Sequence, residues 1–344
     1  MLSFKQIHGQ DAAIELIRRA YAIDRLPHGL LLAGPAGVGK GTTAAVVAAL
    51  FLCERPQANE PCGQCASCKV FEAGNHPDYH VIAKELVWLY NEDSAAKELS
   101  VEVMREHLIV PAGRKPAMNR GKVFVIEQAE VMSVGAQNAC LKTLEEPPGR
   151  ALIILLTDQP NALLATIRSR CQMVRFAALD EPFVRRELQN RGVPAADVAD
   201  LAGLADGSLG LALRWWEDGI LPHARQLKQR LQGLLEAKAI LDLPEFFKGA
   251  SDEYVEMYQK RDDRFAKTQL AREALTIYFR QAAQFFRRQL ADEQEGEVLE
   301  RLCGSIEAIS RAQEHLDTNV NNALIFQQLA VTLERLWQRT AGVI

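Results

Sequence analysis

The stretch Gly34-Pro-Ala-Gly-Val-Gly-Lys-Gly41 lies between an apolar run at 29–33 and an alanine- and valine-rich stretch at 42–50. The apolar run predicts a buried strand, and the following stretch predicts a helix. This order of strand, loop and helix is the context that a phosphate-binding loop requires. Its glycines allow backbone N–H groups to converge on phosphate oxygens at a helix N-terminus. We therefore expect a nucleotide-binding α/β domain, with a simple glycine-rich turn as the alternative interpretation.

The loop departs from the usual pattern at one position. Lys40 would place a positive charge on the outer phosphates, but the Ser or Thr that normally follows and holds Mg²⁺ is Gly41 here. Thr42 comes one position later and is turned by about 100° on the helix, so its hydroxyl does not occupy the position of the usual Mg²⁺ ligand. The sequence predicts a nucleotide site in which Mg²⁺ lacks its usual ligand. It leaves open whether ATP or ADP binds at this site. Its candidate residues are Gly34, Gly37, Gly39, Lys40, Gly41 and Thr42.

Length and composition limit the possible classes of protein. A chain of 344 residues is too long for one ordinary core, so we expect two or three domains. The net charge of −4 gives no global positive field that would attract nucleic acid. No long apolar segment predicts a membrane span, and the first residues lack a signal-peptide pattern. We expect a cytoplasmic protein without membrane contact.

Four of the seven cysteines lie close together in the sequence. Their spacing is C-x8-C-x2-C-x2-C, and the odd total with three scattered members argues against a disulfide framework. Four thiolates suit a tetrahedral Zn²⁺ and leave no open position for chemistry. The sequence predicts a structural zinc site within an insertion at about 53–75, with four reduced thiols in a loop as the alternative. The predicted ligands are Cys53, Cys62, Cys65 and Cys68.

Strand and helix patterns alternate through the first half of the chain. A helix is expected at 3–24, with Ile7, Ile14, Ile17 and Tyr21 on its apolar stripe. Further strands are expected at 79–82, 122–126 and 151–156, and further helices at 99–111 and 136–146. Alternation of this kind predicts a parallel α/β sheet. The remaining sequence predicts short helices and then a bundle of about five helices, which gives expected domains at 1–176, 177–220 and 221–344.

Three segments carry a resemblance to a known family. They are residues 123–132 (VFVIEQAEVM), residues 137–148 (QNACLKTLEEPP) and Ser169-Arg170-Cys171. They resemble the clamp-loader subunits of replicative DNA polymerases, and the cysteine spacing resembles the bacterial members. Gly9-Gln10, residues 25–28 (RLPH) and, more weakly, residues 320–325 (VNNALI) are similar too.

The resemblance implies a particular architecture and assembly. It implies an AAA+, RecA-like P-loop domain with a zinc-binding insertion, then a small helical lid domain and an all-α collar that joins subunits. It implies a hetero-oligomer with gamma/tau and delta subunits, the beta sliding clamp and primed DNA, located at the replisome on the nucleoid. Such a chain is a component of the DNA polymerase III holoenzyme and has no polymerase site of its own.

Departures from the family pattern are as informative as the matches. ATP-hydrolysing members carry an Asp-Glu pair after the buried strand, where this chain has Glu127-Gln128. Glu127 can still approach a metal ion, but Gln128 cannot accept a proton as a base. The sensor arginine of active members is replaced by Gly210. Because each such part contributes orders of magnitude to phosphoryl transfer, we expect little or no ATP hydrolysis.

Two other residues have expected roles. The resemblance implies that Arg170 crosses a subunit interface and acts as an arginine finger on ATP bound by a neighbour; a solvated charge at a strand edge is the alternative. Thr157, at the end of the 151–156 strand, is a candidate sensor near the γ-phosphate or else a strand-end cap.

Two competing functions stay open at this point. The chain can be a weakly active clamp-loader ATPase in which Glu127 binds the metal. It can also be a phosphotransferase, because Gly39-Lys40-Gly41-Thr42 resembles the loop of adenylate kinases. Those kinases are shorter and lack the segments at 137–148 and 169–171.

Overall fold

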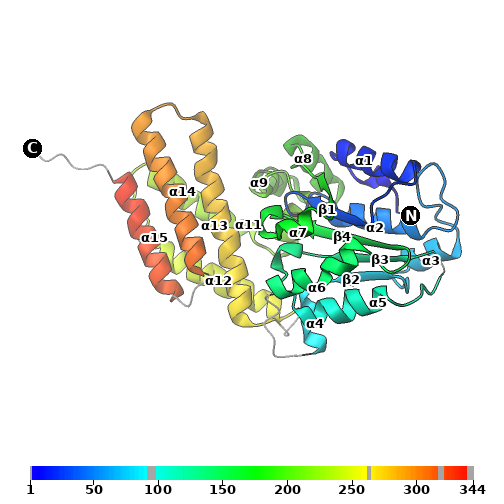
Figure 1. The fold of residues 1–344 in the computed structure, drawn as a ribbon. Coiled ribbons are helices and arrows are strands. Elements are labelled where there is room, and N and C mark those ends of the chain that lie inside the picture. Colours follow the sequence, from blue (N-terminus) through cyan, green and yellow to red (C-terminus); the bar gives the residue numbers. More distant parts are fainter. Residues whose placement is uncertain (1, 91–97, 119, 262–264, 317–320, 339–344) are drawn as a thin grey trace, which may run out of the picture. The chain divides into compact units, whose positions relative to one another are not determined.

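The computed structural model describes residues 2–90, 98–118, 120–261, 265–316 and 321–338 (Figure 1). The chain divides into two compact units. The first contains residues 1–191 and 205–211, and the second contains residues 192–204 and 212–344. The expected division at 176 and 220, including a separate lid, stays a prediction. No helix among the described residues combines the length and the apolar composition that crossing a bilayer requires.

The first unit is built on a parallel sheet of five strands in the order β2-β3-β4-β1-β5; Figure 1 labels the first four of these. The strands are β1 (Gly29–Ala33), β2 (Tyr79–Ile82), β3 (Lys122–Ile126), β4 (Ala151–Thr157) and β5 (Gln172–Arg175). The first four confirm the strands expected from the apolar runs. The sequence analysis missed β5, because only one of its four residues is buried and they give no apolar run.

The central strands β1, β3 and β4 are buried at every position. Alternate side chains of these strands belong to two separate cores, as the period of two in a strand requires. One core includes residues of α1 (Asp11–Ala22) and α2 (Lys40–Leu52). The other includes residues of α4 (Val101–Met104) and α6 (Val134–Glu145) on the opposite face (Figure 1). The unit is therefore a three-layer α/β fold, as the alternating pattern predicted.

The remaining helices of the first unit are short. They are α3 (Ala66–Glu72), α5 (Val110–Ala112), α7 (Ala165–Arg168) and α8 (Glu181–Asn190). A π-helical turn, Arg105–Ile109, joins α4 to α5, so the helix expected at 99–111 is continuous but irregular. Ser100 caps it as expected, because its Oγ accepts a hydrogen bond from the Val103 N–H at 3.3 Å.

The expected helix at 3–24 was wrong in its first third. Ser3 caps a single 3₁₀ turn, Phe4–Gln6, and α1 begins only at Asp11. Gly9 interrupts the helix with φ of +67°, a left-handed conformation that favours glycine. Ile7 is buried although it is not helical, so its spacing from Ile14 imitated a helical stripe.

The second unit contains helices joined by short loops, and no strand lies among its described residues. It contains α9 (Ala195–Ala205) up to residue 204, most of α10 (Leu209–Glu217) and the bundle formed by α11 (Leu221–Leu235), α12 (Leu243–Gln259), α13 (Lys267–Asp292), α14 (Gly296–Leu316) and α15 (Asn322–Trp337). Phe279, Phe286 and Trp337 are buried in the bundle as predicted, whereas Phe285 is only partly buried. Asn321 caps α15 as expected, because its Oδ1 accepts from the Ala323 N–H at 3.0 Å. Val320, which belonged to the resembling segment, lies outside the described residues.

Candidate functional site

The phosphate-binding loop joins the end of β1 to the first residue of α2, at the edge where parallel α/β sheets bind ligands. Gly34 must be glycine, because a Cβ there would lie 2.3 Å from the Phe176 carbonyl oxygen. Gly37 has φ of +71°, and a Cβ there would lie 2.3 Å from Ser208 Oγ. Gly39 also has a positive φ, of +103°. The predicted strand, loop and helix are therefore present.

Lys40 lies inside this loop. Its side chain is buried, and Nζ donates to the carbonyl oxygens of Gly34 and of Pro35, the latter at 2.6 Å. Burial lowers the pKa of the ammonium group, while the carboxylates of Asp158 and Glu130 act in the opposite direction. The amine is thus satisfied by backbone carbonyls of its own loop.

The residues after Lys40 lack a hydroxyl group in the metal-binding position. Gly41 and Thr42 are exposed on the first turn of α2. Thr43 is buried, and its Oγ1 donates back to the Gly39 carbonyl at 2.9 Å. The Thr43 hydroxyl is therefore already used in a hydrogen bond to the backbone at the start of α2.

Three of the predicted site residues lie at the ends of β3 and β4. Glu127 directly follows β3, and loss of solvation, with the neighbouring Glu85 carboxylate, raises the pKa of its carboxyl group. Gln128 has a left-handed backbone with φ of +49°. Thr157 is the last residue of β4, and its hydroxyl accepts from the Gln159 N–H at 3.0 Å, which fits the strand-end cap.

Sequence reasoning missed Glu130 and Asp158. Burial raises the pKa of the Glu130 carboxyl group, a hydrogen bond with Thr157 opposes this, and Asp158 adds to the rise. Glu130 Oε2 is buried without a hydrogen-bond partner among the described residues. Both residues follow strand ends in the sequence, but a single turn after a strand does not reveal which side chains turn toward the loop.

The segment at 207–211 covers the loop within the first unit. Ser208 Oγ donates to the Ala36 carbonyl at 2.7 Å, and the Gly210 N–H donates to the Gly37 carbonyl at 2.9 Å. A Cβ on Gly210 would lie 2.8 Å from Gly37 Cα, so a larger residue does not fit this contact. The position of the missing sensor arginine is therefore a close backbone contact.

Gln10 joins the N-terminal segment to the same region. Its side chain is buried, with Nε2 donating to the Ala177 carbonyl at 2.8 Å and Oε1 accepting from the Ala177 N–H at 3.0 Å. This pair of hydrogen bonds explains why a polar residue follows Gly9 at a buried position.

Arg170 lies two residues after α7. Its Nε donates to Glu145 Oε1 at 2.6 Å, Nη2 donates to the same oxygen, and Nη1 donates to the Thr166 carbonyl at 2.9 Å. The Arg170 and Glu145 side chains are 31% and 47% exposed, so the ion pair is at the surface. The two residues come from the segments 169–171 and 137–148, which the resemblance singled out separately.

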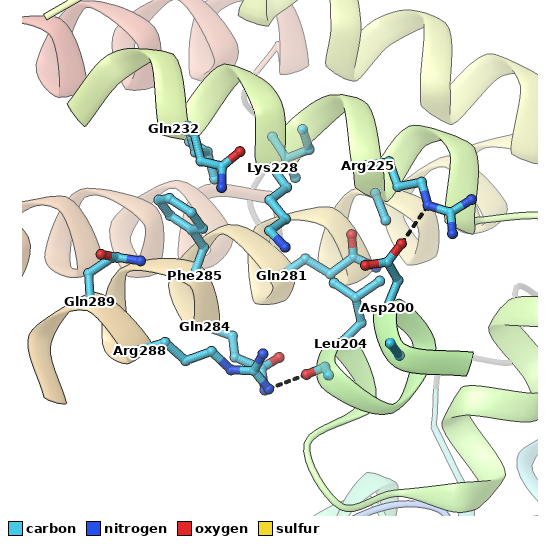
Figure 2. A pocket seen from close by; sticks show the side chains of 15 residues that line it. Asp200, Leu204, Arg225, Lys228, Gln232, Gln281, Gln284, Phe285, Arg288 and Gln289 are labelled. Atoms are coloured by element: carbon cyan, nitrogen blue, oxygen red, sulfur yellow. Dashed lines mark hydrogen bonds and ion pairs between the residues drawn. The ribbon is translucent and has the colours of Figure 1, made fainter. Parts of the chain in front are cut away.

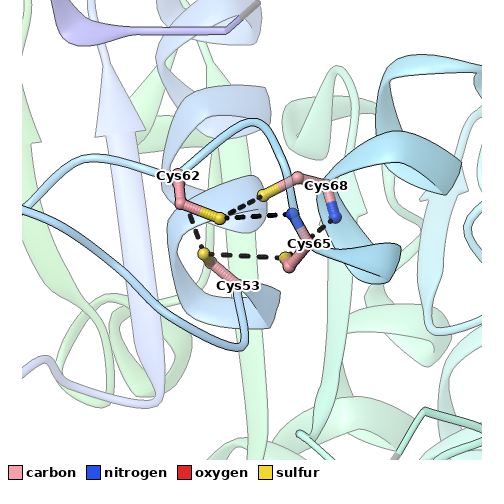
Figure 3. A group of neighbouring side chains, drawn as sticks. All are labelled: Cys53, Cys62, Cys65 and Cys68. Carbon is pink, nitrogen blue, oxygen red and sulfur yellow. Dashed lines mark hydrogen bonds between the residues drawn. The ribbon is translucent and has the colours of Figure 1, made fainter.

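The four predicted metal-binding cysteines converge at the end of α2 and the start of α3 (Figure 3). Their sulfur atoms all lie within 4.8 Å of one another, and the Cys53–Cys65 and Cys62–Cys68 pairs are 4.0 Å apart. Four sulfurs around Zn²⁺ at about 2.3 Å form a tetrahedron with edges of about 3.8 Å, so the cluster fits a metal ion.

Backbone N–H groups support the sulfur atoms. The N–H groups of residues 62, 65 and 68 donate to Sγ of Cys53, Cys62 and Cys65 at 3.3–3.4 Å. The pKa of the Cys62 thiol is lowered to about 6, first by the Gln64 N–H and then by the Cys65 N–H. Donors of this kind stabilise thiolates, which are the form that binds metal.

The order of strands and the loop after β1 define an α/β fold of the P-loop class, in agreement with the expected AAA+ fold. A family model described as "DNA polymerase III, delta subunit" matches residues 9–180, half of the chain. The chain belongs to this family, which confirms the resemblance to bacterial clamp-loader subunits and in particular to the delta′ subunit.

Individual relatives agree with this assignment. The delta′ subunit of Pseudomonas aeruginosa is 36% identical over 61% of this chain and 62% of its own length. The Escherichia coli delta′ subunit is 33% identical over 58% of this chain and 57% of its own. The tau/gamma subunit of Haemophilus influenzae is 32% identical over 70% of this chain and 35% of its own length. The chain therefore matches less than two thirds of the length of these relatives.

A solved structure of a gamma subunit-related protein from Thermotoga maritima is 20% identical and covers 94% of this chain and 99% of its own. Its TM-score of 0.48 is too low to define the fold, which follows from the strands and the loop described above.

Proposed function

We propose that this chain is a delta′-type subunit of the DNA polymerase III clamp loader. In this proposal it hydrolyses ATP poorly or not at all and helps to load the sliding clamp onto primed DNA. It assembles with gamma/tau and delta subunits in a hetero-oligomer and supplies Arg170 to ATP bound by a neighbouring subunit. ATP or ADP can stay bound to its own loop as a structural element, with Mg²⁺ poorly held.

The observation that supports the proposal is that groups of this chain itself occupy the hydrogen-bonding and packing positions of the phosphate-binding loop. Lys40 donates to carbonyl groups of its own loop, and Gly210 packs against Gly37 where active members carry an arginine. Gly41 and Gln128 supply neither a metal-binding hydroxyl nor a catalytic base. Phosphoryl transfer depends on positioning and charge compensation, and these groups normally provide both.

Arg170 is suited to act on another subunit. Its ion-pair partner among the described residues is the surface carboxylate of Glu145, and surface ion pairs typically contribute only about 0–1 kcal/mol. A triphosphate carries more charge than Glu145 and can compete for the guanidinium group. An arginine finger supplied by a neighbouring subunit typically accelerates phosphoryl transfer by about 10³–10⁵-fold.

ATP binding and turnover by the purified chain, with and without AMP, provide the first test. We expect no turnover, with or without bound nucleotide. Transfer of phosphate to AMP would indicate the adenylate-kinase-like alternative instead.

A reconstituted loader tests the finger itself. Arg170→Ala should lower ATP hydrolysis at the neighbouring site by about a thousandfold or more. Arg168→Ala is the matched control, because Arg168 is on the same segment and its Nη1 donates to Asn161 at 3.1 Å. Full activity of the Arg170→Ala loader would refute the proposed role.

A weakly active ATPase is the second candidate, and Glu130 is the observation that favours it. The Glu130 Oε2 atom is buried without a partner in the described part of the chain, and the carboxylate lies close enough to Lys40 to affect the pKa of the ammonium group. Slow turnover that both Lys40→Ala and Glu130→Gln abolish would support this function.

A further inference from the structure

Buried polar side chains differ between the two units. On α13, Gln281 lies beside a cavity of about 320 Å³ (Figure 2), and neither of its amide atoms has a hydrogen-bond partner among the described residues. In the first unit, Ser67, His76 and Asp78 are 1%, 5% and 1% exposed, and all three are hydrogen-bonded. Burial of polar groups is costly unless they are paired, so a paired set indicates a fixed local structure. We call these three residues the polar relay.

The hydrogen bonds of the polar relay determine the protonation of its histidine. Ser67 Oγ has one hydrogen, which it donates to the Leu52 carbonyl at 2.8 Å, so His76 Nε2–H must donate to Ser67 Oγ at 3.0 Å. His76 Nδ1 then accepts from the Asp78 N–H at 3.1 Å. Burial lowers the pKa of the His76 ring, although the Asp78 carboxylate opposes this, which agrees with a neutral ring.

This arrangement is not a catalytic triad, although it contains a serine, a histidine and an aspartate. In a triad, the carboxylate accepts from the Nδ1–H of the histidine. Here Nδ1 is an acceptor, and the Asp78 carboxylate accepts from the Ala117 and Met118 N–H groups, each at 2.8 Å. Ser67 is also closed off from solvent. The polar relay therefore holds backbone segments in place and does no chemistry.

One end of the polar relay lies among the predicted metal ligands. Ser67 is on the first turn of α3, between Cys65 and Cys68. Its acceptor Leu52 directly precedes Cys53 at the end of α2. A metal ion bound by the cysteines fixes the end of α2 against the start of α3, and thereby the Leu52 carbonyl against the Ser67 hydroxyl.

The other end lies at the edge of the sheet. Asp78 directly precedes β2, and its carbonyl accepts from the Val123 N–H of β3 at 2.9 Å. Its carboxylate holds the turn at 117–118, ahead of β3. Among the described strands β2 pairs with β3 alone, so it has fewer hydrogen bonds than a central strand to keep it in place.

We propose that metal binding by the four cysteines is coupled through the polar relay to the local stability of β2 and of the turn at 117–118. Metal in the cluster then stabilises the edge of the sheet as well as its own module. Coupling between two sites is reciprocal, so interrupting the polar relay weakens metal binding by the same factor by which metal stabilises the edge.

Amide hydrogen exchange of the full-length chain, with zinc and after its removal by a chelator, tests the coupling. The readouts are the amides of Ala117 and Met118, because their acceptor is the Asp78 carboxylate at the far end of the polar relay. We expect zinc to slow their exchange by about twofold to tenfold, the range that one net hydrogen bond supplies.

Two variants interrupt the polar relay at its central hydrogen bond. Ser67→Ala removes the hydroxyl group. His76→Asn keeps an acceptor for the Asp78 N–H, as in an Asx turn, but is too short to reach Ser67. In either variant, exchange at 117 and 118 should no longer respond to zinc, and zinc affinity in competition with a chromogenic chelator should fall by the same factor of about two to ten. The double variant should lose no more than either single one, because both remove one shared link.

The matched control is His28→Asn, because His28 Nε2 donates to the Leu144 carbonyl at 2.7 Å outside the polar relay. It should leave both readouts as in the wild type. Exchange at 117 and 118 that ignores zinc in the wild type would overturn the proposal, as would a chain that takes up no zinc. A full response to zinc in both relay variants would also overturn it and place the coupling in the packing of α2 and α3. If His76→Asn does not fold, Ser67→Ala gives the same test with the histidine in place.

Discussion

Replacing Cys65 by serine isolates the contribution of metal to the cysteine cluster. Cys65 is buried, and its Sγ both faces the other three sulfurs and caps α3 by accepting from the Cys68 N–H at 3.4 Å. Serine is itself a good N-cap residue, so the substitution keeps the helix cap and removes a metal ligand. Any large effect of Cys65→Ser therefore reports on metal binding.

The structure sets the size of the expected effect. The separate core of this module consists of Cys53, Cys65 and Cys68, with Cys62 packed against them, while Phe71 of α3 belongs to the larger core of the first unit. Structural Zn²⁺ sites contribute about 10–16 kcal/mol, which is about 2.5–4 kcal/mol for each of four equal ligands. The substitution should weaken zinc affinity by about a hundredfold to a thousandfold.

Metal content by mass spectrometry and competition with a chromogenic chelator measure this loss. Amide hydrogen exchange should rise at residues 53–74 and stay slow in β1, β3 and β4, because those strands have their own core. Cys303→Ser is the control, since Cys303 is exposed and outside the cluster. A chain that purifies without metal, and whose exchange does not change on adding zinc, would refute the zinc assignment.

Two further predictions concern the surroundings of the loop. Gly210→Arg places an arginine where the family resemblance implies the sensor of active members, and it should not restore ATP turnover. It should destabilise the chain by about 1–3 kcal/mol, because its Cβ meets the Gly37 backbone at 2.8 Å. Thermal unfolding measures this loss, with Gly249→Arg at an open helical position as the control, and a gain of turnover would contradict the prediction. Gln10→Ala should lower the free energy of unfolding in urea by about 1–3 kcal/mol, because it removes the two part-buried hydrogen bonds to the Ala177 backbone. An unchanged midpoint would show that water replaces the side chain.

The sheet was predictable because its central strands are buried on both faces. Runs such as 122–126 and 151–156 are apolar at nearly every position, and no alternative structure buries them as well. The edge strand β5 gave no such signal, since burial on one side leaves a mixed sequence. The helix at 3–24 failed for the opposite reason: Ile7 is apolar and buried, but Gly9 turns the chain before α1.

The candidate sites were predictable only where spacing determines chemistry. The cysteine spacing was sufficient to predict that the four thiols converge, because short loops bring such thiols together whatever surrounds them. The approach of Glu130 and Asp158 to Lys40, and the hydrogen bonds from Arg170 to Glu145, depend on how separate strand ends meet. Single-sequence patterns do not contain that information.

The glycines of the loop do not by themselves indicate nucleotide binding in this chain. Gly34 is required by the Phe176 carbonyl, and Gly37 and Gly210 are required by each other. Packing within the folded protein would therefore select for these residues even if no phosphate ever entered the loop. Lys40 follows the same logic, because its ammonium group satisfies two loop carbonyls. A loop can thus keep the sequence of a nucleotide site as part of its structure while the groups needed for hydrolysis are lost, and this is why turnover and binding must be measured separately.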